Sequence, residues 1–227
     1  MNFNFDGFLK SFPEIAQALP ITLQITLTSM LAGLLLGTIL ALLIRFKIPV
    51  LAQLAHVYIS FFRGTPLLVQ LFVLYYGLPQ LFPVFSALQS VSAALIGLSL
   101  NMAAYLSESI RGALNAVDRG QMDACLSAGM SRLQGLYHVV LPQAARVAVP
   151  SLANSFVGLL KESSLVFALG VTEILAQAKQ YASLTYCYME AFLAVALVYW
   201  AITVLFGAAQ RRLEARLNIP YQQGASA

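Results

Sequence analysis

Residues 20–44 read PITLQITLTSMLAGLLLGTILALLI and contain no charged side chain. A helix of about 20 mostly apolar residues is long enough to cross the hydrocarbon core of a bilayer, so this stretch predicts a membrane-spanning helix. Gly33 and Gly37 within it have the small-xxx-small spacing that allows two helices to approach closely. The stretch therefore favours an integral membrane protein with closely packed helices.

The composition of the whole chain agrees with this. Of 227 residues, 59% are hydrophobic and 10% are charged, whereas about a quarter are charged in an average soluble domain. So few charges cannot cover a soluble surface, and so apolar a chain is not disordered. The net charge of +4 comes from basic residues beside apolar stretches, which indicates orientation in a bilayer rather than nucleic-acid binding. Cys125 and Cys187 form no CxxC motif and predict neither a disulfide nor a metal site.

The same length criterion predicts an all-α, polytopic membrane protein with a single transmembrane domain over residues 1–227. Five spans are expected, at about residues 20–44, 52–77, 91–115, 150–177 and 186–209. Pro150 is expected to be the first helical residue of the fourth span, because proline suits that position. The motif Arg63-Gly64-Thr65-Pro66 predicts an irregular segment in the second span, which is tolerated at membrane depth only where it faces protein or water.

Basic residues are concentrated in alternate loops, and the segment from Leu78 to Ser90 carries no charge. The basic segments follow the first, third and fifth spans: Arg45 and Lys47; Arg119, Arg132 and Arg146; and Arg211, Arg212 and Arg216. Basic loops face the cytoplasm, so the N-terminus is predicted outside and the C-terminus inside the cell.

The loop at about residues 118–142 is the least apolar part of the chain. A short helix is expected over residues 121–128, ending at Gly129 as a C′ glycine. Ser131 and Gln134 fit a capping box that starts a second short helix, which Pro142 is expected to end. Periodicity alone leaves open an ordinary interfacial loop that binds nothing.

Three motifs in this order give the chain a resemblance to a known family. Asp123-Ala124-Cys125, then Gly129, then Val140-Leu141-Pro142 resembles the EAA loop of bacterial ABC-importer permeases, with Asp in place of Glu and Cys in place of the second Ala. The segments 62–70, 101–112 and 161–165 are similar to those of the polar amino-acid group (histidine, glutamine, arginine and cystine permeases). The resemblance is closest to a cystine-type permease.

This resemblance implies a type I importer permease in the bacterial inner membrane that is not itself an enzyme. It implies a second, identical or homologous permease, an extracytoplasmic amino-acid-binding protein, and a dimer of ATP-binding subunits that dock on the EAA-type loop through Asp123, Ala124, Gly129, Leu141 and Pro142. No cofactor is expected in this chain, because ATP would be bound by the partner subunit. In agreement, none of its four lysines follows a glycine, as a Walker A loop requires.

Polar residues are expected near the middle of the bilayer in the third and fourth spans. Asn101 lies ten residues after Val91, hence roughly 15 Å below the outer surface. Lys161 and Glu162 lie 11 and 12 residues after Pro150, hence roughly 16–18 Å above the inner surface. If the two spans are neighbours, these groups share one polar layer.

An amino-acid zwitterion needs an acceptor for its ammonium group and donors for its carboxylate. We therefore expect Asn101, Glu162 and Ser163 to be substrate contacts, with Tyr105 on the same face of its helix as Asn101. The alternative is that Lys161 and Glu162 only neutralise each other or mark a structural break in the helix.

Three other charged residues lie within the second and third spans. Glu108 and Arg111 are spaced as a structural ion pair. Arg63 is either a residue of the transport pathway or a packing residue at the irregular segment.

Two other functional classes fit the sequence less well. A self-sufficient secondary transporter or channel predicts an internal inverted repeat and more spans, and no such repeat is found. A membrane enzyme would need paired carboxylates, a metal cluster or a Ser/His set, and the sequence shows none of these in a recognisable pattern.

Overall fold

The structure is a computed structural model in which residues 3–222 are described, with their side chains as far as residue 215; the side chain of Arg216 lies outside this part. Within residues 3–222 the chain is all-helical, as predicted, and η marks a 3-10 or π segment. The elements are α1 (Phe5–Ala16), α2 (Leu19–Arg45), α3 (Leu51–Gly64), α4 (Leu67–Phe72), η1 (Val73–Gly77), α5 (Leu78–Leu81), η2 (Pro83–Ala87), α6 (Ser90–Ala116), α7 (Arg119–Ser127), α8 (Arg132–Gly135), η3 (Leu136–Val140), α9 (Leu141–Glu162), η4 (Ser163–Leu169), α10 (Ile174–Thr185) and α11 (Tyr188–Gln222).

Four helical stretches in the described part of the chain are long and apolar enough to cross a membrane: Leu19–Arg45, Ser90–Ala116, Arg132–Leu169 and Tyr188–Ala215. A fifth is formed by the pair Leu51–Gly64 and Leu67–Leu81, if the two helices are taken as one broken span. They are bent by 108° at the segment between them. The irregular backbone predicted at Arg63-Gly64-Thr65-Pro66 is therefore confirmed.

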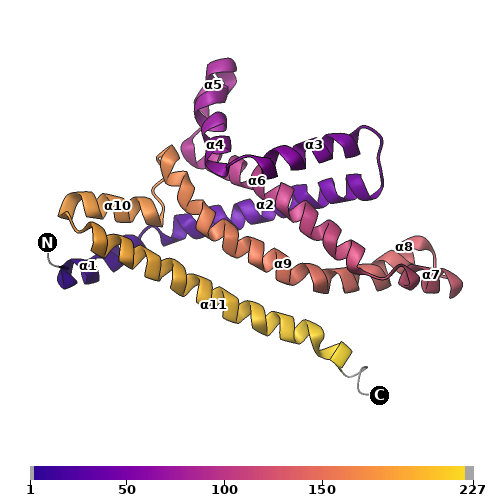
Figure 1. The fold of residues 1–227 in the computed structure, drawn as a ribbon. Helices are drawn as coiled ribbons and strands as arrows, with labels where there is room; N and C mark the ends of the chain where they lie inside the picture. The colour runs from indigo at the N-terminus through magenta and orange to yellow at the C-terminus, as the bar shows by residue number, and fades with distance from the viewer. Residues whose placement is uncertain (1–2, 223–227) are drawn as a thin grey trace.

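α6 is the central helix of the molecule. α2, α3 and α9 all contact it, as do α4 and η4 (Figure 1). The main core includes Ile25, Leu71, Leu98, Leu106 and Leu159, which are almost fully buried. A second cluster joins α1, α10 and α11 at the end of the molecule that holds the N-terminus, opposite α7 and α8.

The close approach predicted from Gly33 and Gly37 is confirmed between α2 and α6. A Cβ atom added to Gly33 would lie 3.0 Å from the Met102 Cβ, and one added to Gly37 would lie 2.9 Å from the carbonyl oxygen of Ala103. The second obstacle is backbone, which cannot turn away as a side chain can. Gly37 is therefore required by the packing of the two helices.

Replacing Gly37 with alanine should lower stability by about 1–3 kcal/mol, the usual cost of overpacking a core. Gly158 in α9 is the matched control, because an added Cβ meets nothing within 4 Å there. Gly158→Ala should raise stability by about 0.5–1 kcal/mol, because alanine favours a helix over glycine. Thermal unfolding in detergent can be followed with a thiol-reactive dye, since Cys125 and Cys187 are buried free thiols. Equal shifts in the two variants would contradict the close approach.

The fourth span begins earlier than predicted. Pro142 does not end a helix and Pro150 does not begin one: Pro142 lies in the first turn of α9 and Pro150 lies inside it. The preceding π segment is closed by the Leu141 N–H donating to the Leu136 carbonyl, and this widened turn gives the Pro142 ring room in a continuing helix. The second helix of the loop therefore runs without interruption from Arg132 to Leu169.

The same span also ends earlier than the predicted residue 177. η4 tightens the last turns, and Gly170 closes them with a left-handed φ of 84°. Glu173 then caps a new helix, α10, by accepting from the backbone N–H groups of Leu175 and Ala176. α10 packs on α1 and α11, so residues 174–177 belong to a separate element.

α1 was not predicted. Asn4 caps it by accepting from the Gly7 N–H at 2.9 Å, and the Tyr181 hydroxyl donates to the Gly7 carbonyl at 2.9 Å. The Asn4 N–H also donates to the Glu190 carboxylate at 2.6 Å. Length alone does not reveal such a helix, because it is too short to cross a bilayer.

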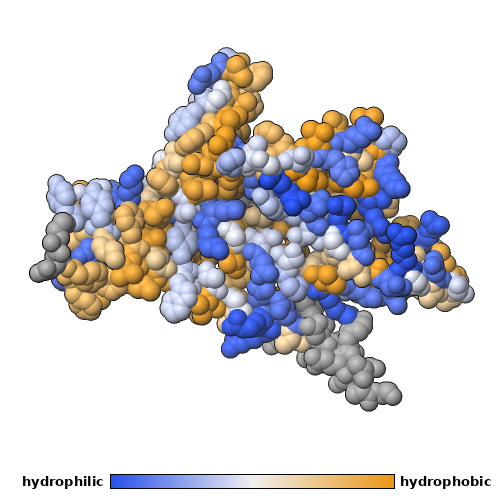
Figure 2. Space-filling model, in the orientation of Figure 1, coloured by the Kyte–Doolittle hydropathy of each residue, from blue (hydrophilic) through white to orange (hydrophobic). Residues whose placement is uncertain are grey.

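On the face shown in Figure 2, hydrophobic residues gather at the end that holds α1 and α10 and on a projecting arm, whereas hydrophilic residues are concentrated toward α7 and α8. One apolar region is the arm formed by α4, η1 and α5, which projects from the helical body. Val73, Leu81 and Val84 on and beside this arm are more than half exposed. Such a surface fits a bilayer or a partner rather than water.

Candidate functional site

The break in the second span is held by two buried amides. The Gln70 side chain donates to the carbonyl oxygens of Phe62 and Thr65 at 2.9 and 3.0 Å, and to the Thr65 hydroxyl at 2.8 Å. The Asn101 side chain, from α6, donates to the Gln70 amide oxygen at 2.9 Å and to the Phe62 carbonyl at 3.2 Å. These contacts satisfy carbonyl groups that the helix break at Pro66 leaves without partners.

The structure thus places Asn101 in a buried hydrogen-bond network, and its contact with a substrate stays a prediction. It is 4% exposed, and both N–H donors of its amide are used within the chain. In this conformation it shapes the polar layer by fixing the broken span.

Replacing Asn101 with leucine should destabilise the protein by about 1–3 kcal/mol, since it removes the buried partner of Gln70. Gln70→Leu should cost a similar amount, and the double variant should cost much less than the sum, because the two side chains act as one unit. Ser99→Ala is the control: Ser99 is also buried in α6 but bonds only to Leu95 in its own helix. Additive losses in the double variant would contradict the shared role.

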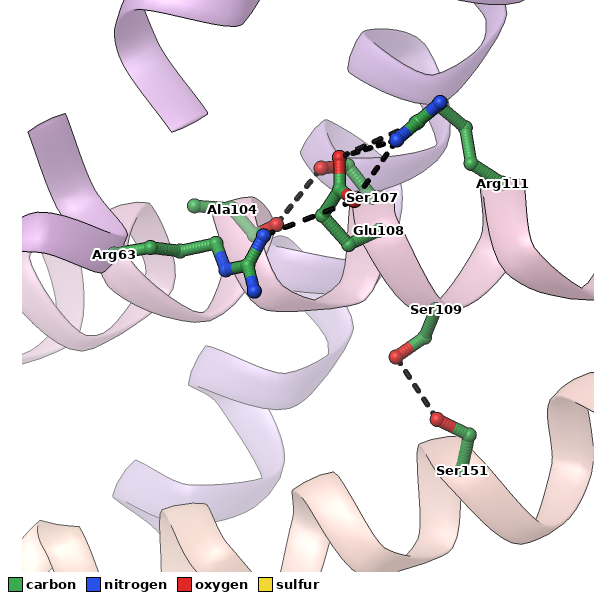
Figure 3. A network of polar contacts seen from close by, with 7 residues as sticks. All are labelled: Arg63, Ala104, Ser107, Glu108, Ser109, Arg111 and Ser151. Atoms are coloured by element: carbon green, nitrogen blue, oxygen red, sulfur yellow. Dashed lines mark hydrogen bonds and ion pairs between the residues drawn. The ribbon is translucent and has the colours of Figure 1, made fainter. Parts of the chain in front are cut away.

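A charged cluster lies where α3 meets α6 (Figure 3). Arg111 donates to both carboxylate oxygens of Glu108 at 2.9 Å, which confirms the predicted pair. Arg63 lies further away, at 3.7 Å from Glu108, and its guanidinium carbon is 5.6 Å from the centre of the Tyr105 ring. The single carboxylate of Glu108 thus lies within ion-pair distance of both guanidinium groups, which leaves the cluster with a net positive charge.

Arg63 is the looser of the two arginines. Its side chain is 45% exposed, and Tyr105 beside it is 41% exposed. A guanidinium over an aromatic ring keeps donors available for an anion. α9 also contacts α6 beside the cluster, where the Ser151 hydroxyl donates to Ser109 at 2.9 Å (Figure 3).

The segment Lys161-Glu162-Ser163 lies where α9 passes into η4. Lys161 and Glu162 are exposed. Ser163 is 0% exposed, and its hydroxyl donates to the Leu160 carbonyl at 2.7 Å. Within residues 3–215, no hydrogen bond or ion pair joins Asn101 or Tyr105 to Glu162 or Ser163. Tyr105 and Glu162 are thus the two predicted contacts with exposed side chains.

A buried carboxylate, that of Glu173, escaped the sequence reasoning. Glu173 is fully buried and accepts from the Tyr199 hydroxyl at 3.1 Å, in addition to its capping bonds in α10. The Ile174 N–H donates to the Thr22 hydroxyl at 3.2 Å. These contacts attach the start of α10 to α2 and α11. Gly170 followed by Glu173 is the signal that indicates a helix stop and a new cap.

The loop between α6 and α9 has the predicted caps. After α7, the Gly129 N–H donates to the Leu126 carbonyl and the Met130 N–H to the Cys125 carbonyl, both at 3.0 Å. With φ of 83° at Gly129, this is a Schellman ending. The capping box of Ser131 and Gln134 is complete. Both sequence predictions for the loop caps are confirmed.

The predicted docking residues are all exposed. The structure leaves the following five exposed: Asp123, Ala124, Gly129, Leu141 and Pro142. Cys125 is buried against Gly135, where an added Cβ would lie 3.0 Å from the cysteine Cβ. The cysteine that departs from the family pattern therefore faces inward, and the surface available to a partner is unaffected by it.

The part of the chain that the structure describes holds no group of three or more His, Cys, Asp or Glu side chains arranged to bind a metal ion. The ionisable residues of the central region are instead the charged cluster on α3 and α6 and the pair Lys161 and Glu162.

Comparison with known proteins places the chain in a family. Residues 33–219 match the model of the binding-protein-dependent transport system inner membrane component. The probable amino-acid permease protein YxeN of Bacillus subtilis (strain 168) is 52% identical over 219 residues, covering 96% of this chain and 98% of the relative. The probable amino-acid ABC transporter permease protein PatM of Vibrio harveyi is 50% identical over 97% of this chain and 99% of its own length. A crystal structure of an amino acid ABC transporter with histidines aligns with a TM-score of 0.88 and 34% identity, covering 95% of this chain and all of that one.

Proposed function

Because the chain belongs to the family of binding-protein-dependent transport system inner membrane components, we propose that it is the permease subunit of an ATP-binding-cassette importer for a polar amino acid. The observation that carries the proposal is the likeness, over nearly the whole chain, to proteins named amino-acid permeases. The relatives give no support to a self-sufficient secondary transporter.

The importer needs other subunits. A dimer of ATP-binding subunits binds and hydrolyses ATP, a second permease completes the pathway, and an extracytoplasmic binding protein delivers the amino acid. The chain itself carries no catalytic step. The exposed loop residues and the glycine that shapes the loop support its role as the docking site for the ATP-binding subunits.

The continuous helix from Arg132 to Leu169 supports a direct mechanical connection. Glu162 lies 30 residues beyond Arg132 in this helix, hence roughly 45 Å along it. Closure of the ATP-binding dimer would move the docking loop, and the helix would carry that movement to Lys161 and Glu162. The pathway would then open alternately to the two sides of the membrane.

The proposed substrate contacts divide into two kinds. Glu162 accepts from the ammonium group of the amino acid, and Tyr105, with Arg63 against its ring, faces the carboxylate. Asn101 and Ser163 support the site without touching the substrate in this conformation. Both are buried, and they hold the broken span and the start of η4 in place. The excess positive charge of the Arg63 cluster supports this assignment.

The inner membrane of a bacterial cell is the proposed location, with the N-terminus outside and the C-terminus in the cytoplasm. The basic residues beside α2, α6 and α11 support this orientation. The N-terminal helix and the docking loop lie at opposite ends of the molecule, as the orientation requires (Figure 1).

Purification from detergent tests the proposal. Expressed together with the ATP-binding subunit of its own importer, the chain should co-purify with it in equal numbers. Asp123→Lys should lose the ATP-binding subunit, because it reverses an exposed charge in the docking loop. Asp6→Lys, which reverses an equally exposed charge in α1, should keep it. A permease that purifies alone and still transports would contradict the proposal.

A further inference from the structure

A cavity of about 910 Å³ lies behind the docking loop. It is enclosed by the C-terminal part of α2, the end of α6, and the segments α7, α8 and η3. Most of its wall is apolar, and the side chains that form this part include Leu42, Leu114, Met122, Leu126, Leu136 and Val140. The substrate contacts proposed above do not line it, but the docking residues Asp123 and Leu141 do, so it lies directly beside the docking surface.

In the proposed orientation, the cavity extends inward from the cytoplasmic end of α2 along the first span. Arg45 is the last residue of α2, and Thr38 and Leu42 lie seven and three residues before it. At the rise of a helix, these two residues are roughly 10 Å and 5 Å deeper than Arg45. If the open side of the cavity faces the bilayer at this depth, it meets lipid acyl chains, and an apolar cavity of this size favours an acyl chain over water.

Three arginines line the end of the cavity that faces the cytoplasm in the proposed orientation: Arg45, Arg119 and Arg132. None of them takes part in an ion pair within the described residues. Arg45 has one hydrogen bond, to the Asn115 side chain, at 3.5 Å. Asp118 also lines the cavity, but its carboxylate already accepts from the Gly120 N–H at 2.7 Å. The guanidinium groups are thus free to hold an anion.

We propose that this cavity binds one anionic phospholipid of the inner leaflet. An acyl chain lies along Thr38 and Leu42, and the phosphate of the headgroup is held by Arg45, Arg119 and Arg132. An apolar cavity with a basic rim at the cytoplasmic side matches the two parts of such a lipid. The bound lipid would connect the end of the first span to the loop that docks the ATP-binding subunits. The proposal depends on the membrane orientation and not on which amino acid is transported.

The charged residues that line the cavity determine how strongly it should prefer an anionic lipid to a zwitterionic one. Each basic residue near an anionic surface contributes on the order of a fivefold preference. Three arginines are opposed by the two aspartates Asp118 and Asp123, which leaves the equivalent of one arginine. We therefore expect roughly a fivefold preference for phosphatidylglycerol over phosphatidylcholine.

Native mass spectrometry measures this preference. The assembled transporter is released from nanodiscs that contain equal amounts of phosphatidylglycerol and phosphatidylcholine, and the lipids that stay bound per permease are identified. One retained phosphatidylglycerol per permease, in roughly fivefold excess over phosphatidylcholine, is the expected result. Equal retention of the two lipids would overturn the proposal. Retention of neither would also overturn it, because the cavity would then be closed by protein, such as the second permease.

Variants locate the site. The triple change Arg45→Gln, Arg119→Gln and Arg132→Gln should reverse the preference in favour of phosphatidylcholine, because Asp118 and Asp123 are then the charged residues left on the wall. The pair Arg211→Gln and Arg212→Gln is the matched control, because both arginines are exposed on α11 and line no part of the cavity. Leu42→Trp keeps every charge but fills the acyl part, and it should remove the retained lipid even if the triple variant fails to assemble. A Leu42→Trp transporter that retains phosphatidylglycerol as before would show that the lipid binds elsewhere.

Discussion

Gly129→Asp should leave the protein inserted in the membrane and the ATP-binding subunits active, while amino-acid uptake falls by on the order of tenfold or more. A Cβ at this position meets nothing within 4 Å of the chain, so the added carboxylate projects outward from the docking loop. It also occupies a position with φ of 83°, which aspartate tolerates better than most residues. Because a side chain at this left-handed φ is also strained, the loss reports on the shape of the docking loop as well as on its surface. ATP hydrolysis and uptake of labelled amino acid are measured together in proteoliposomes.

Ser86→Asp is the control for Gly129→Asp. It adds the same charge at an exposed position in η2, away from the docking loop, and should leave uptake unchanged. Uptake by Gly129→Asp at the parental rate would count against the docking role of this loop.

Glu162→Gln should weaken uptake by roughly 10- to 100-fold, mainly as a higher KM, because a hydrogen bond to a charged group contributes about 1.5–3 kcal/mol. The glutamine keeps the shape of the side chain but loses the charge that would hold the substrate ammonium group. The structure leaves Glu162 exposed, next to Lys161 and one residue before the start of η4. Initial rates of uptake over a range of substrate concentrations separate KM from the maximal rate.

Glu214→Gln is the matched control for this change. Glu214 accepts from Gln210 near the end of α11, far along the chain from α9, and its substitution should not alter KM. If Glu162→Gln also has a parental KM, Glu162 and Lys161 only neutralise each other and the substrate site lies elsewhere.

Apolar length and local caps were enough to predict much of the fold. The uncharged stretch around Gly33 and Gly37 became α2 and packs closely on α6. Gly129 and Ser131 act as the caps that their types suggest, because such signals depend only on neighbouring residues. The helix break near Pro66 was also visible in the sequence, since glycine and proline are close together there.

Proline misled the prediction in the fourth span. Pro142 and Pro150 usually mark helix ends, but here a π segment and a long packed helix accommodate both. This outcome depends on packing against α6 and α2, which local sequence does not contain. The prediction of a separate loop helix was therefore wrong, and the error concealed the direct connection from the docking loop to Glu162.

The burial of polar residues was the hardest feature of the site to predict. Asn101 was expected to face a substrate, but its partner Gln70 is 31 positions away in the chain. Likewise, Glu173 meets Tyr199, 26 positions away. Depth in the membrane can be estimated from helix rise, but the side of the helix that meets a distant partner cannot. Tyr105 and Glu162 are exposed, and their contact with the substrate stays a prediction.

Transport by reconstituted proteoliposomes tests the central claim most directly. Vesicles containing this chain, with or without its ATP-binding subunit, are given the binding protein and labelled cystine, arginine, histidine or glutamine. We predict accumulation of one of these amino acids only when the ATP-binding subunit and ATP on its side of the membrane are both present. Accumulation by vesicles that contain this chain alone would contradict a permease that is moved by a separate ATPase.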